Sequence, residues 1–492
     1  MINERENGFF TVGLCERSLG TELCTDFTLA DYQSEIRRVL NVSAVPLPPA
    51  KYVGADAVEF NGNVDYQLLY VGGDGGVYSA PLSGEYSFSV PYDRGECEAG
   101  NVSVLCTVVS ESVSARVSAP RRLSIRCRLR PTVRIYGKRM AETAIMSEVD
   151  PTSVYTQDLS CDSLVCDSGV SDTITLNTSV SLSGDDVRVV SADTKIIIDN
   201  SEYSQDGMMC RGRVMLKLLC VCESNGEYSV LTKEIPFDGG LEVSLGTPDG
   251  LCRVRGVLSE MSVNVNDATA ECSMGILLEA VAEKNDEVVY TSDIYSTKNE
   301  CECRVADIST RRVIACQNAN LTFSERVSLS SVGIPEDAVL IDTIGTVCFE
   351  KCETVDTKQV FGGNADFTVI YKKDGEVYAS AVKLPVRYEM QTGDTAVSFE
   401  CTCEATDIRA KIDQGELRID AELIMSADCM GESRAEMIDN ARFGETVQRA
   451  DSELIVCYPS AEDTLWSVAK RYKVAPEAIL GDPVEDKYVV IE

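Results

Sequence analysis

Histidine is absent from this chain of 492 residues, and tryptophan occurs once, at Trp466. The lack of histidine excludes serine–histidine–acid triads, cysteine–histidine dyads and every histidine-ligated metal site. Basic residues are also scarce: 45 lysines and arginines stand against 79 aspartates and glutamates, which gives a formal net charge of −34. Such a charge makes nucleic acid and anionic lipid poor partners. A carboxylate or thiol enzyme, a binding protein and a structural adaptor remain open.

Long apolar runs are missing as well. No stretch approaches the roughly 18 apolar residues that span a bilayer, and the N-terminal residues lack a cationic start followed by an apolar segment. We therefore expect no signal peptide and no direct membrane insertion. The 21 cysteines are numerous. In a reducing cytoplasm we expect them to stay thiols that serve as small buried apolar groups.

The chain repeats itself at a spacing near 150 residues. Gly62, Gly212 and Gly363 lie in similar segments and are 150 and 151 residues apart. Each glycine is followed by an apolar run, a turn and a tyrosine, and is preceded by an acid and an apolar pair. A period of this length is too long for a solenoid repeat and indicates three copies of one domain. The acids are Glu35, Asp185 and Glu336, the apolar pairs Val39-Leu40, Val189-Val190 and Leu340-Ile341, and the tyrosines Tyr78, Tyr228 and Tyr378.

Within each copy the pattern favours strands. Apolar residues alternate or run over about eight positions, a glycine-containing turn follows, and a second such run begins, as in a hairpin. Residues 29–40 have the best helical pattern of the first copy. We therefore predict a mainly β chain of three tandem sandwich-like domains with at most a short helix in each. The expected boundaries are 1–145, 146–298 and 299–445, then a polar connection around 431–452 and a small α+β module at 452–492.

The C-terminal module has a strand–helix–helix–strand pattern. Apolar residues recur at helical spacing between residues 465 and 472, and Asp463 is expected to be the N-cap of this helix. A second short helix is expected to begin near Pro476 and to end at Gly481. The flanking strands are expected at 454–458 and 488–492.

This module resembles a LysM domain. The matching residues are 463–466 (Asp-Thr-Leu-Trp), 468–469 (Val-Ala) and 472–474 (Tyr-Lys-Val). It departs from the family pattern at Glu462, where glycine is usual, and at 482–483, where Asp-Pro stands in place of Asn-Pro. LysM domains hold N-acetylglucosamine chains in a groove beside these loops. The resemblance thus implies peptidoglycan as one candidate ligand.

The three copies resemble SPOCS domains, through the glycine, the Leu-Leu-Tyr type of apolar run and the Val-Tyr hairpin. SPOCS domains followed by a LysM domain are the arrangement of SipL-type spore-coat morphogenetic proteins. The resemblance implies a non-enzymatic protein without a cofactor in the mother-cell cytoplasm. It would bind the coat-basement ATPase, or another coat protein, at the forespore surface, with the LysM-like module as a main contact. The alternative is a cell-wall protein whose module binds peptidoglycan; a carboxylate glycosidase is a more distant one.

Four residues of the predicted helix are candidates for protein binding. Trp466 either packs in the core of the module or exposes one face of its indole as an anchor for a partner. Lys470, Arg471 and Lys473 make the helix locally basic in an acidic chain. They form either a solvated face or a surface that docks on an acidic partner.

A second basic segment contains Arg126, Arg128 and Arg130, which alternate and would share one face of a strand. They are expected to bind a polyanion, to pair with acids of a neighbouring unit, or to form part of a protein-binding face. Cysteines two residues apart also share a strand face and could assemble a thiolate zinc site. These cysteine pairs do not recur at matching positions, so we expect no metal site. They are Cys220 with Cys222, Cys301 with Cys303, and Cys401 with Cys403.

Overall fold

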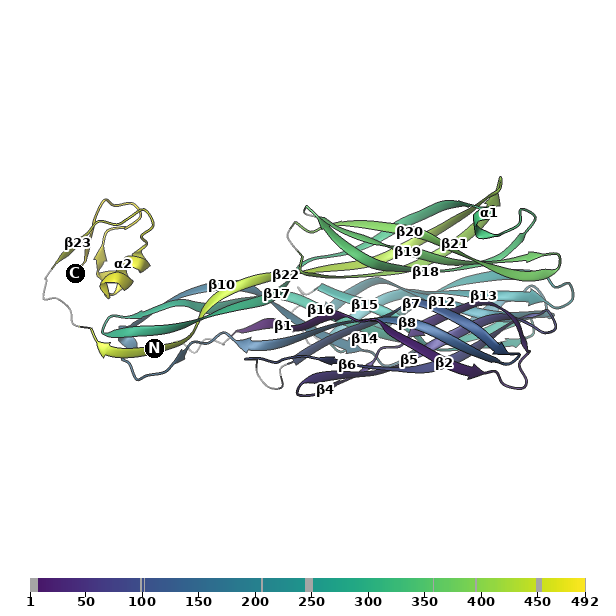
Figure 1. Cartoon of the computed structure of the whole chain (residues 1–492), viewed down its shortest axis with the longest axis horizontal. Helices are drawn as coiled ribbons and strands as arrows, with labels where there is room; N and C mark the ends of the chain where they lie inside the picture. The colour runs from purple at the N-terminus through teal and green to yellow at the C-terminus, as the bar shows by residue number, and fades with distance from the viewer. Residues whose placement is uncertain are drawn as a thin grey trace.

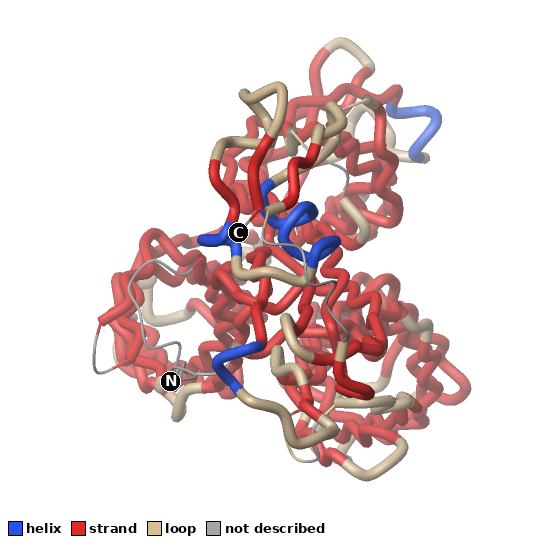
Figure 2. Tube along the Cα trace, turned by 90° about the vertical axis from the view of Figure 1, so that its left-hand side faces the viewer, coloured by secondary structure: helices blue, strands red, loops and turns tan. Residues whose placement is uncertain are grey.

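The computed structural model describes residues 8–97, 100, 102–204, 207–243, 251–356, 358–393, 396–447 and 454–491. The N-terminal residues used for the signal-peptide prediction lie largely outside the described residues, which begin at Gly8. Antiparallel strands dominate, so the expected mainly β fold class is confirmed. Three sandwich units lie side by side, and an extension leads from them to a small module (Figure 1). Viewed from the side of the module, the three units form three lobes around a common axis (Figure 2).

All three units share one plan. One antiparallel sheet has three strands in units 2 and 3 and a short fourth strand in unit 1. The hairpin that follows forms the opposite sheet together with the first strand of the unit, which pairs with the last strand. In units 1 and 2 this first strand is broken into two pieces, whereas in unit 3 it is continuous. Unit 1 comprises β1 (Phe9–Ser18), β2 (Thr21–Thr28), β3 (Ile36–Pro46), β4 (Ala50–Val53), β5 (Ala57–Gly72), β6 (Val77–Pro91), β7 (Val102–Ala119) and β8 (Arg122–Met140).

The other two units follow in chain order after the short β9 (Ala144–Ile145). Unit 2 comprises η1 (Pro151–Ser153), β10 (Val154–Val170), β11 (Ile174–Ser181), β12 (Val187–Ser204), β13 (Gly207–Cys222), β14 (Tyr228–Leu241), β15 (Leu251–Asn266) and β16 (Thr269–Ser296). Unit 3 comprises β17 (Asn299–Ser328), α1 (Leu329–Val332), β18 (Val339–Val355), β19 (Lys358–Lys373), β20 (Glu376–Gln391), β21 (Ser398–Asp413) and β22 (Glu416–Thr446).

The repeated glycines sit in the central strands β5, β13 and β19. A Cβ atom on Gly363 would overlap the carbonyl oxygen of Cys348, and one on Gly212 would overlap that of Ile197. In unit 1 a Cβ atom on Gly62 would overlap the ring of Tyr86. Glycine is therefore required because a neighbouring strand or ring approaches the backbone closely. This packing requirement explains the strongest signal of the repeat.

The helix predicted for residues 29–40 is wrong. Residues 29–35 form a turn, and β3 begins at Ile36 and pairs with β5. Only Leu29, Ile36 and Leu40 of this segment are buried, whereas Tyr32 is 88% exposed. In a helix Tyr32 and Ile36 would lie on the same face, yet one is exposed and the other is buried. The pairing with β5 provides the backbone hydrogen bonds instead, so tertiary context overrides the local pattern.

The units meet at an apolar cluster on the shared axis. Equivalent positions carry Leu40, Val190 and Ile341 on strands β3, β12 and β18. The central strands add a second set of equivalent residues, Leu69, Leu219 and Ile370. We call this group the apolar axis cluster; its remaining buried members are Val71, Val77, Val221 and Val377. The second residue of each predicted apolar pair thus serves contact between units, whereas the first packs against the core of its own unit.

Three cation–π contacts surround this cluster, and each joins a cation of one unit to a tyrosine of another. The guanidinium carbon of Arg38 lies 4.2 Å from the ring centre of Tyr378, and that of Arg188 lies 4.9 Å from the ring centre of Tyr78. Each arginine also donates to the carbonyl oxygen before its tyrosine. The third contact uses Lys372, whose Nζ is 6.0 Å from the Tyr228 ring centre. Unit 1 contacts unit 3, unit 2 contacts unit 1, and unit 3 contacts unit 2, which closes the ring.

The extension, called the stalk here, consists of residues 154–163 of β10, 286–296 of β16, 299–309 of β17 and 434–446 of β22 (Figure 1). Its interior is apolar, with buried side chains that include Ile294, Ile438 and Phe443. The polar stretch expected to connect the third unit with the module is therefore wrong up to Thr446, because it belongs to the 31-residue strand β22. Its polar side chains alternate with buried apolar ones.

The C-terminal module comprises β23 (Ile455–Cys457), α2 (Leu465–Tyr472), η2 (Pro476–Ala478), β24 (Ile479–Leu480) and β25 (Val489–Ile491). The N-cap of α2 is Thr464 rather than Asp463: the Thr464 hydroxyl accepts from the backbone N–H of Ser467, and Ser467 returns a bond to the N–H of Thr464. The second expected helix is only the 3₁₀ turn at Pro476, and a strand follows it. The module core contains Val468 and Val489.

Candidate protein-binding site

The module is fixed to the stalk by its tryptophan. The indole of Trp466 packs edge-on against Tyr295 of β16, with ring centres 5.0 Å apart, and its Nε1 donates to Asp293 Oδ2 at 2.8 Å. The Tyr295 hydroxyl in turn donates to the carbonyl oxygen of Val474 at 2.7 Å. Trp466 thus packs mainly between the module and the stalk. Trp466 is half-buried and packs against the cluster that the module core forms with Tyr295, so the predicted core packing holds in part and extends to the stalk.

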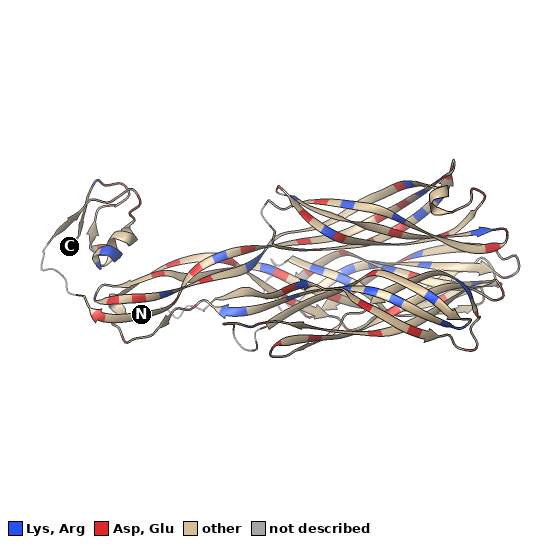
Figure 3. Cartoon of the chain, in the orientation of Figure 1, with Lys and Arg blue, Asp and Glu red and all other residues tan. Residues whose placement is uncertain are grey.

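The cations of α2 pair within the chain. Lys470 Nζ lies 2.5 Å from Asp293 Oδ1, and Lys473 pairs with Glu300 of β17. Arg471 pairs with Asp463, and this hydrogen bond lowers the pKa of Asp463 to about 2. Figure 3 shows the basic positions of α2 on the side of the module that faces the stalk. The basic helix therefore complements an acidic surface of the same chain.

Asp293 is the centre of this attachment. Burial opposes its ionisation, but the hydrogen bonds from Lys470 and Trp466 outweigh that effect and keep its pKa below the ordinary value. The carboxylate therefore accepts from an ammonium and an indole at once, and such charge-assisted bonds are stronger than neutral ones. The attachment combines them with an aromatic contact, which fixes the orientation of the module.

The opposite side of the module is an open sheet face. Its strands pair in the order β23-β25-β24, and the register aligns Val456, Val490 and Leu480 in one row across the sheet. Cys457 and Val489 point to the buried side, so the row faces away from the core. Tyr458 and Tyr488 extend this face, with ring centres 6.3 Å apart. We call it the outer sheet face; its members are Leu454, Val456, Tyr458, Leu480, Tyr488 and Val490.

The predicted arginine ladder lies on β8. Arg126 pairs with Glu22 at 2.9 Å, and Arg128 pairs with Glu111 at 2.9 Å; both arginine side chains remain largely exposed. Arg130 is mostly buried and donates to the carbonyl oxygen of Phe349 in unit 3 at 2.7 Å. The ladder therefore pairs mainly with acids of its own unit, and Arg130 joins two units.

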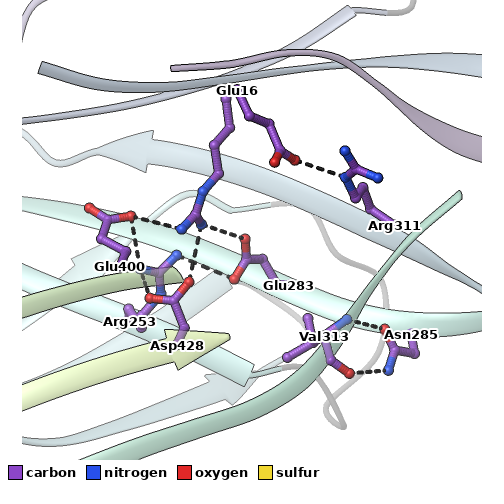
Figure 4. Close-up of polar contacts among 9 residues, drawn as sticks. Glu16, Arg253, Glu283, Asn285, Arg311, Val313, Glu400 and Asp428 are labelled. Carbon is purple, nitrogen blue, oxygen red and sulfur yellow. Dashed lines mark hydrogen bonds and ion pairs between the residues drawn. The ribbon is translucent and has the colours of Figure 1, made fainter. Parts of the chain in front are cut away.

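A dense group of ionisable side chains lies buried on the axis, toward the stalk. Asp428 of unit 3 accepts from Arg134 of unit 1 at 3.1 Å and from Arg253 of unit 2 at 2.7 Å (Figure 4). Arg253 also pairs with Glu283 and with Glu400, each at 3.3 Å. We call these five residues the axial charge cluster. Every unit contributes to it.

Two arginines in this cluster face three carboxylates, so one acid is in excess. Burial raises the pKa of Glu283 above its ordinary value, against the attraction of Arg253. Burial also opposes ionisation of Glu400, but Arg134 and Arg253 outweigh it and lower the pKa of Glu400. Each acid pairs with an arginine. The cluster is therefore better suited to holding the units together than to acid–base chemistry.

Further polar contacts join the units beside this cluster. The amide of Asn285 exchanges two hydrogen bonds with the backbone of Val313, each of 2.8 Å, and Arg311 Nε donates to Glu16 at 3.0 Å (Figure 4). A groove of about 1290 Å³ runs between the three units. Lys195 and Glu404 pair across it at 3.4 Å, which links units 2 and 3. These contacts fix the units relative to one another.

All 21 cysteines are free thiols. Cys301 and Cys303 are neighbours on β17, with sulfur atoms 3.3 Å apart. Burial raises the pKa of Cys301 to about 12, which disfavours the thiolate that a metal would need. Within the described residues no group of three or more cysteine, aspartate or glutamate side chains is placed to hold a metal ion.

Sequence reasoning missed the outer sheet face and the axial charge cluster. The alternation of exposed and buried residues at 454–458 was a usable signal, because it marks Leu454, Val456 and Tyr458 as one face of a strand. The axial charge cluster had no such signal, since equivalent positions of the three units carry different residues. Its members come from five strands that only the fold brings together.

Among the described residues, no helix has the length and apolar character needed to cross a membrane. The chain was compared with family models, curated proteins and solved structures, and none of the three comparisons gave a match.

Proposed function

We propose that this chain is a non-enzymatic adaptor in assembly of the bacterial endospore envelope. It binds a coat-basement morphogenetic ATPase at the forespore surface from the mother-cell side, and its LysM-like module is a main contact. The SPOCS-like repeats and the LysM-like module support this proposal, because that order is typical of SipL-type proteins. An acidic chain rich in free thiols is compatible with a reducing cytoplasm.

The construction of the molecule favours a role in positioning. Three units are tied together by an apolar cluster, a ring of cation–tyrosine contacts and a buried charge cluster. From this body the stalk carries the module outward (Figure 1). A body fused in this way holds its binding surfaces at fixed separations, which favours simultaneous attachment to a polymer.

The observation that carries the proposal is the orientation of the module. Trp466, Lys470 and Lys473 attach it to the stalk, so the outer sheet face is presented away from that attachment. Exposed aromatic and apolar side chains gathered on one small face are typical of a protein-binding surface.

One feature favours a second candidate, a cell-wall protein whose module binds N-acetylglucosamine chains. Tyr458 and Tyr488 expose two neighbouring rings on the module, and sugar rings pack on such apolar faces. Trp466 cannot report this binding by fluorescence, because its indole faces the stalk. Calorimetry with N-acetylglucosamine hexamer is therefore the suitable measurement.

The proposal is tested with the purified chain and the purified coat-basement ATPase from one spore former. The full chain and a chain ending at residue 447 are immobilised separately, and binding of the ATPase is measured at each surface. We expect binding to the full chain and loss of most of it on truncation. Far-ultraviolet circular dichroism should show that the truncated chain keeps its β structure. Equal binding to both chains, or saturable binding of the hexamer without any binding of the ATPase, would refute the adaptor.

A further inference from the structure

The outer sheet face is apolar over its whole breadth. The row of Val456, Val490 and Leu480 crosses all three strands, and Tyr458 and Tyr488 continue it at one end. Four of these five side chains are at least 46% exposed; Val490, in the middle strand, is half-buried. Rigid aromatic rings beside aliphatic side chains are the composition of the buried centre of protein interfaces.

The charges next to this face are mainly acidic. The loop that joins β24 to β25 carries Asp482, Glu485, Asp486 and a single cation, Lys487. The carboxylates of Asp482 and Asp486 accept hydrogen bonds from the loop backbone, so these two acids also shape the loop. Two of the module's cations, by contrast, pair with acids of the stalk. The module thus turns those cations inward and presents an apolar face with an acidic border.

We propose that the outer sheet face is the surface by which the module binds its partner. The partner segment is an apolar protein surface bordered by lysines and arginines. This inference rests on the proposed function, because it takes the module as a main contact. It reverses the charge expected from the sequence, where the basic helix α2 predicted an acidic partner. The acidic border complements a cationic rim, and the whole chain, with a net charge of −34, favours the same sign of partner.

The centre of the face is tested with Val456→Lys. Lysine at this position places a charge in the apolar row, and we expect the affinity for the coat-basement ATPase to fall by about tenfold or more, as at the centre of other interfaces. Val289→Lys is the matched control: both valines are 46% exposed and lie on strands, but Val289 belongs to the stalk. The control should bind like the unmodified chain.

The border is tested with a pair of opposite charge reversals, Glu485→Lys and Lys487→Glu. Both side chains are exposed and lie in the same loop. For a cationic partner rim, Glu485→Lys should lower the association rate constant by roughly two- to fivefold at low salt, and Lys487→Glu should raise it. Both effects should shrink near 1 M salt, where the Debye length is about 3 Å. If Glu485→Lys instead raised the association rate constant and Lys487→Glu lowered it, the rim of the partner would not be cationic.

The outcomes separate this inference from the proposed function. If truncation at residue 447 abolishes binding of the ATPase but Val456→Lys does not, the adaptor stands and the outer sheet face is wrong. If truncation has no effect, the proposed function itself fails. Light scattering of the purified chain shows whether a second copy of the chain covers the outer sheet face. A dimer that Val456→Lys converts to a monomer would overturn the inference in favour of self-association. Hexamer binding lost in Val456→Lys would overturn it in favour of a glycan.

Discussion

Two clusters on the same axis join the three units in opposite ways. In the apolar axis cluster, equivalent positions carry equivalent residues, as in Leu69, Leu219 and Ile370. In the axial charge cluster they differ. The twelfth residue after the start of the last strand is Arg134 in unit 1, Val281 in unit 2 and Asp428 in unit 3. Its partner on the preceding strand is Leu105, Arg253 and Glu400 respectively.

The difference decides which assemblies each cluster permits. Three copies of any single unit could form the apolar axis cluster, since each copy would supply aliphatic side chains. Three copies of unit 1 would instead bury three arginines at the other cluster, and three copies of unit 3 would bury six carboxylates. Buried charges of one sign are strongly unfavourable. The apolar axis cluster therefore provides contact between units of any kind, whereas the axial charge cluster excludes three copies of unit 1 and three copies of unit 3.

The largest effect is expected from Arg134→Met. This substitution keeps an unbranched apolar stem but leaves three buried carboxylates with Arg253 alone, so we expect the free energy of unfolding to fall by about 3–5 kcal/mol. Urea denaturation followed by far-ultraviolet circular dichroism measures this loss, whereas Trp466 reports on the contact between the module and the stalk. Arg126→Met on the same strand is the control, because its exposed pair with Glu22 is expected to contribute less than about 1 kcal/mol. Equal losses in the two variants would mean that the cluster is not a tie between units.

A smaller loss is expected from Leu219→Ala in the apolar axis cluster. The side chain is 2% exposed, and its removal should lower the free energy of unfolding by about 2–4 kcal/mol. Leu69→Ala, at the equivalent position of unit 1, should cost the same within about 1 kcal/mol, because both leucines occupy matching surroundings. The same denaturation experiment compares them. If the two substitutions lowered the free energy of unfolding by clearly different amounts, the units would not be equivalent at this cluster.

The same contrast explains which parts of the fold could be predicted from the sequence. The repeat was visible because packing requires glycine at three matching positions and aliphatic residues at others. The axial charge cluster was invisible because its function depends on unlike residues at matching positions, and a repeat search discards such positions. The helix expected at residues 29–40 failed for another reason: Ile36 and Leu40 obey helical spacing, but they are the buried residues of a paired strand. Local periodicity cannot tell which partner a segment finds.

Part of the candidate site could be predicted from the sequence. The sequence placed Trp466 and the cations of α2 on one short helix, and the structure keeps them there. It could not show that Asp293 and Glu300, more than 160 residues earlier in the chain, lie against that helix. Once those acids are paired with the module, the surface left open is the sheet on its other side. The sign expected for the partner therefore depends on a contact that no local pattern encodes.

The smallest effect at neutral pH is expected from Glu283→Gln, which keeps the shape of the side chain and removes only its charge. Burial raises the pKa of Glu283 in the folded chain above the ordinary value of 4.5. The folded state then holds a proton that the unfolded chain releases, so the stabilisation is complete below pH 4.5 and is lost as the pH rises through the folded pKa. The advantage of the unmodified chain over Glu283→Gln should therefore decline above pH 4.5. Glu400, whose lowered pKa acts in the opposite direction, is present in both proteins. Urea midpoints from pH 4 to pH 8 measure that difference; a constant or rising value would show that Glu283 is not the acid in excess.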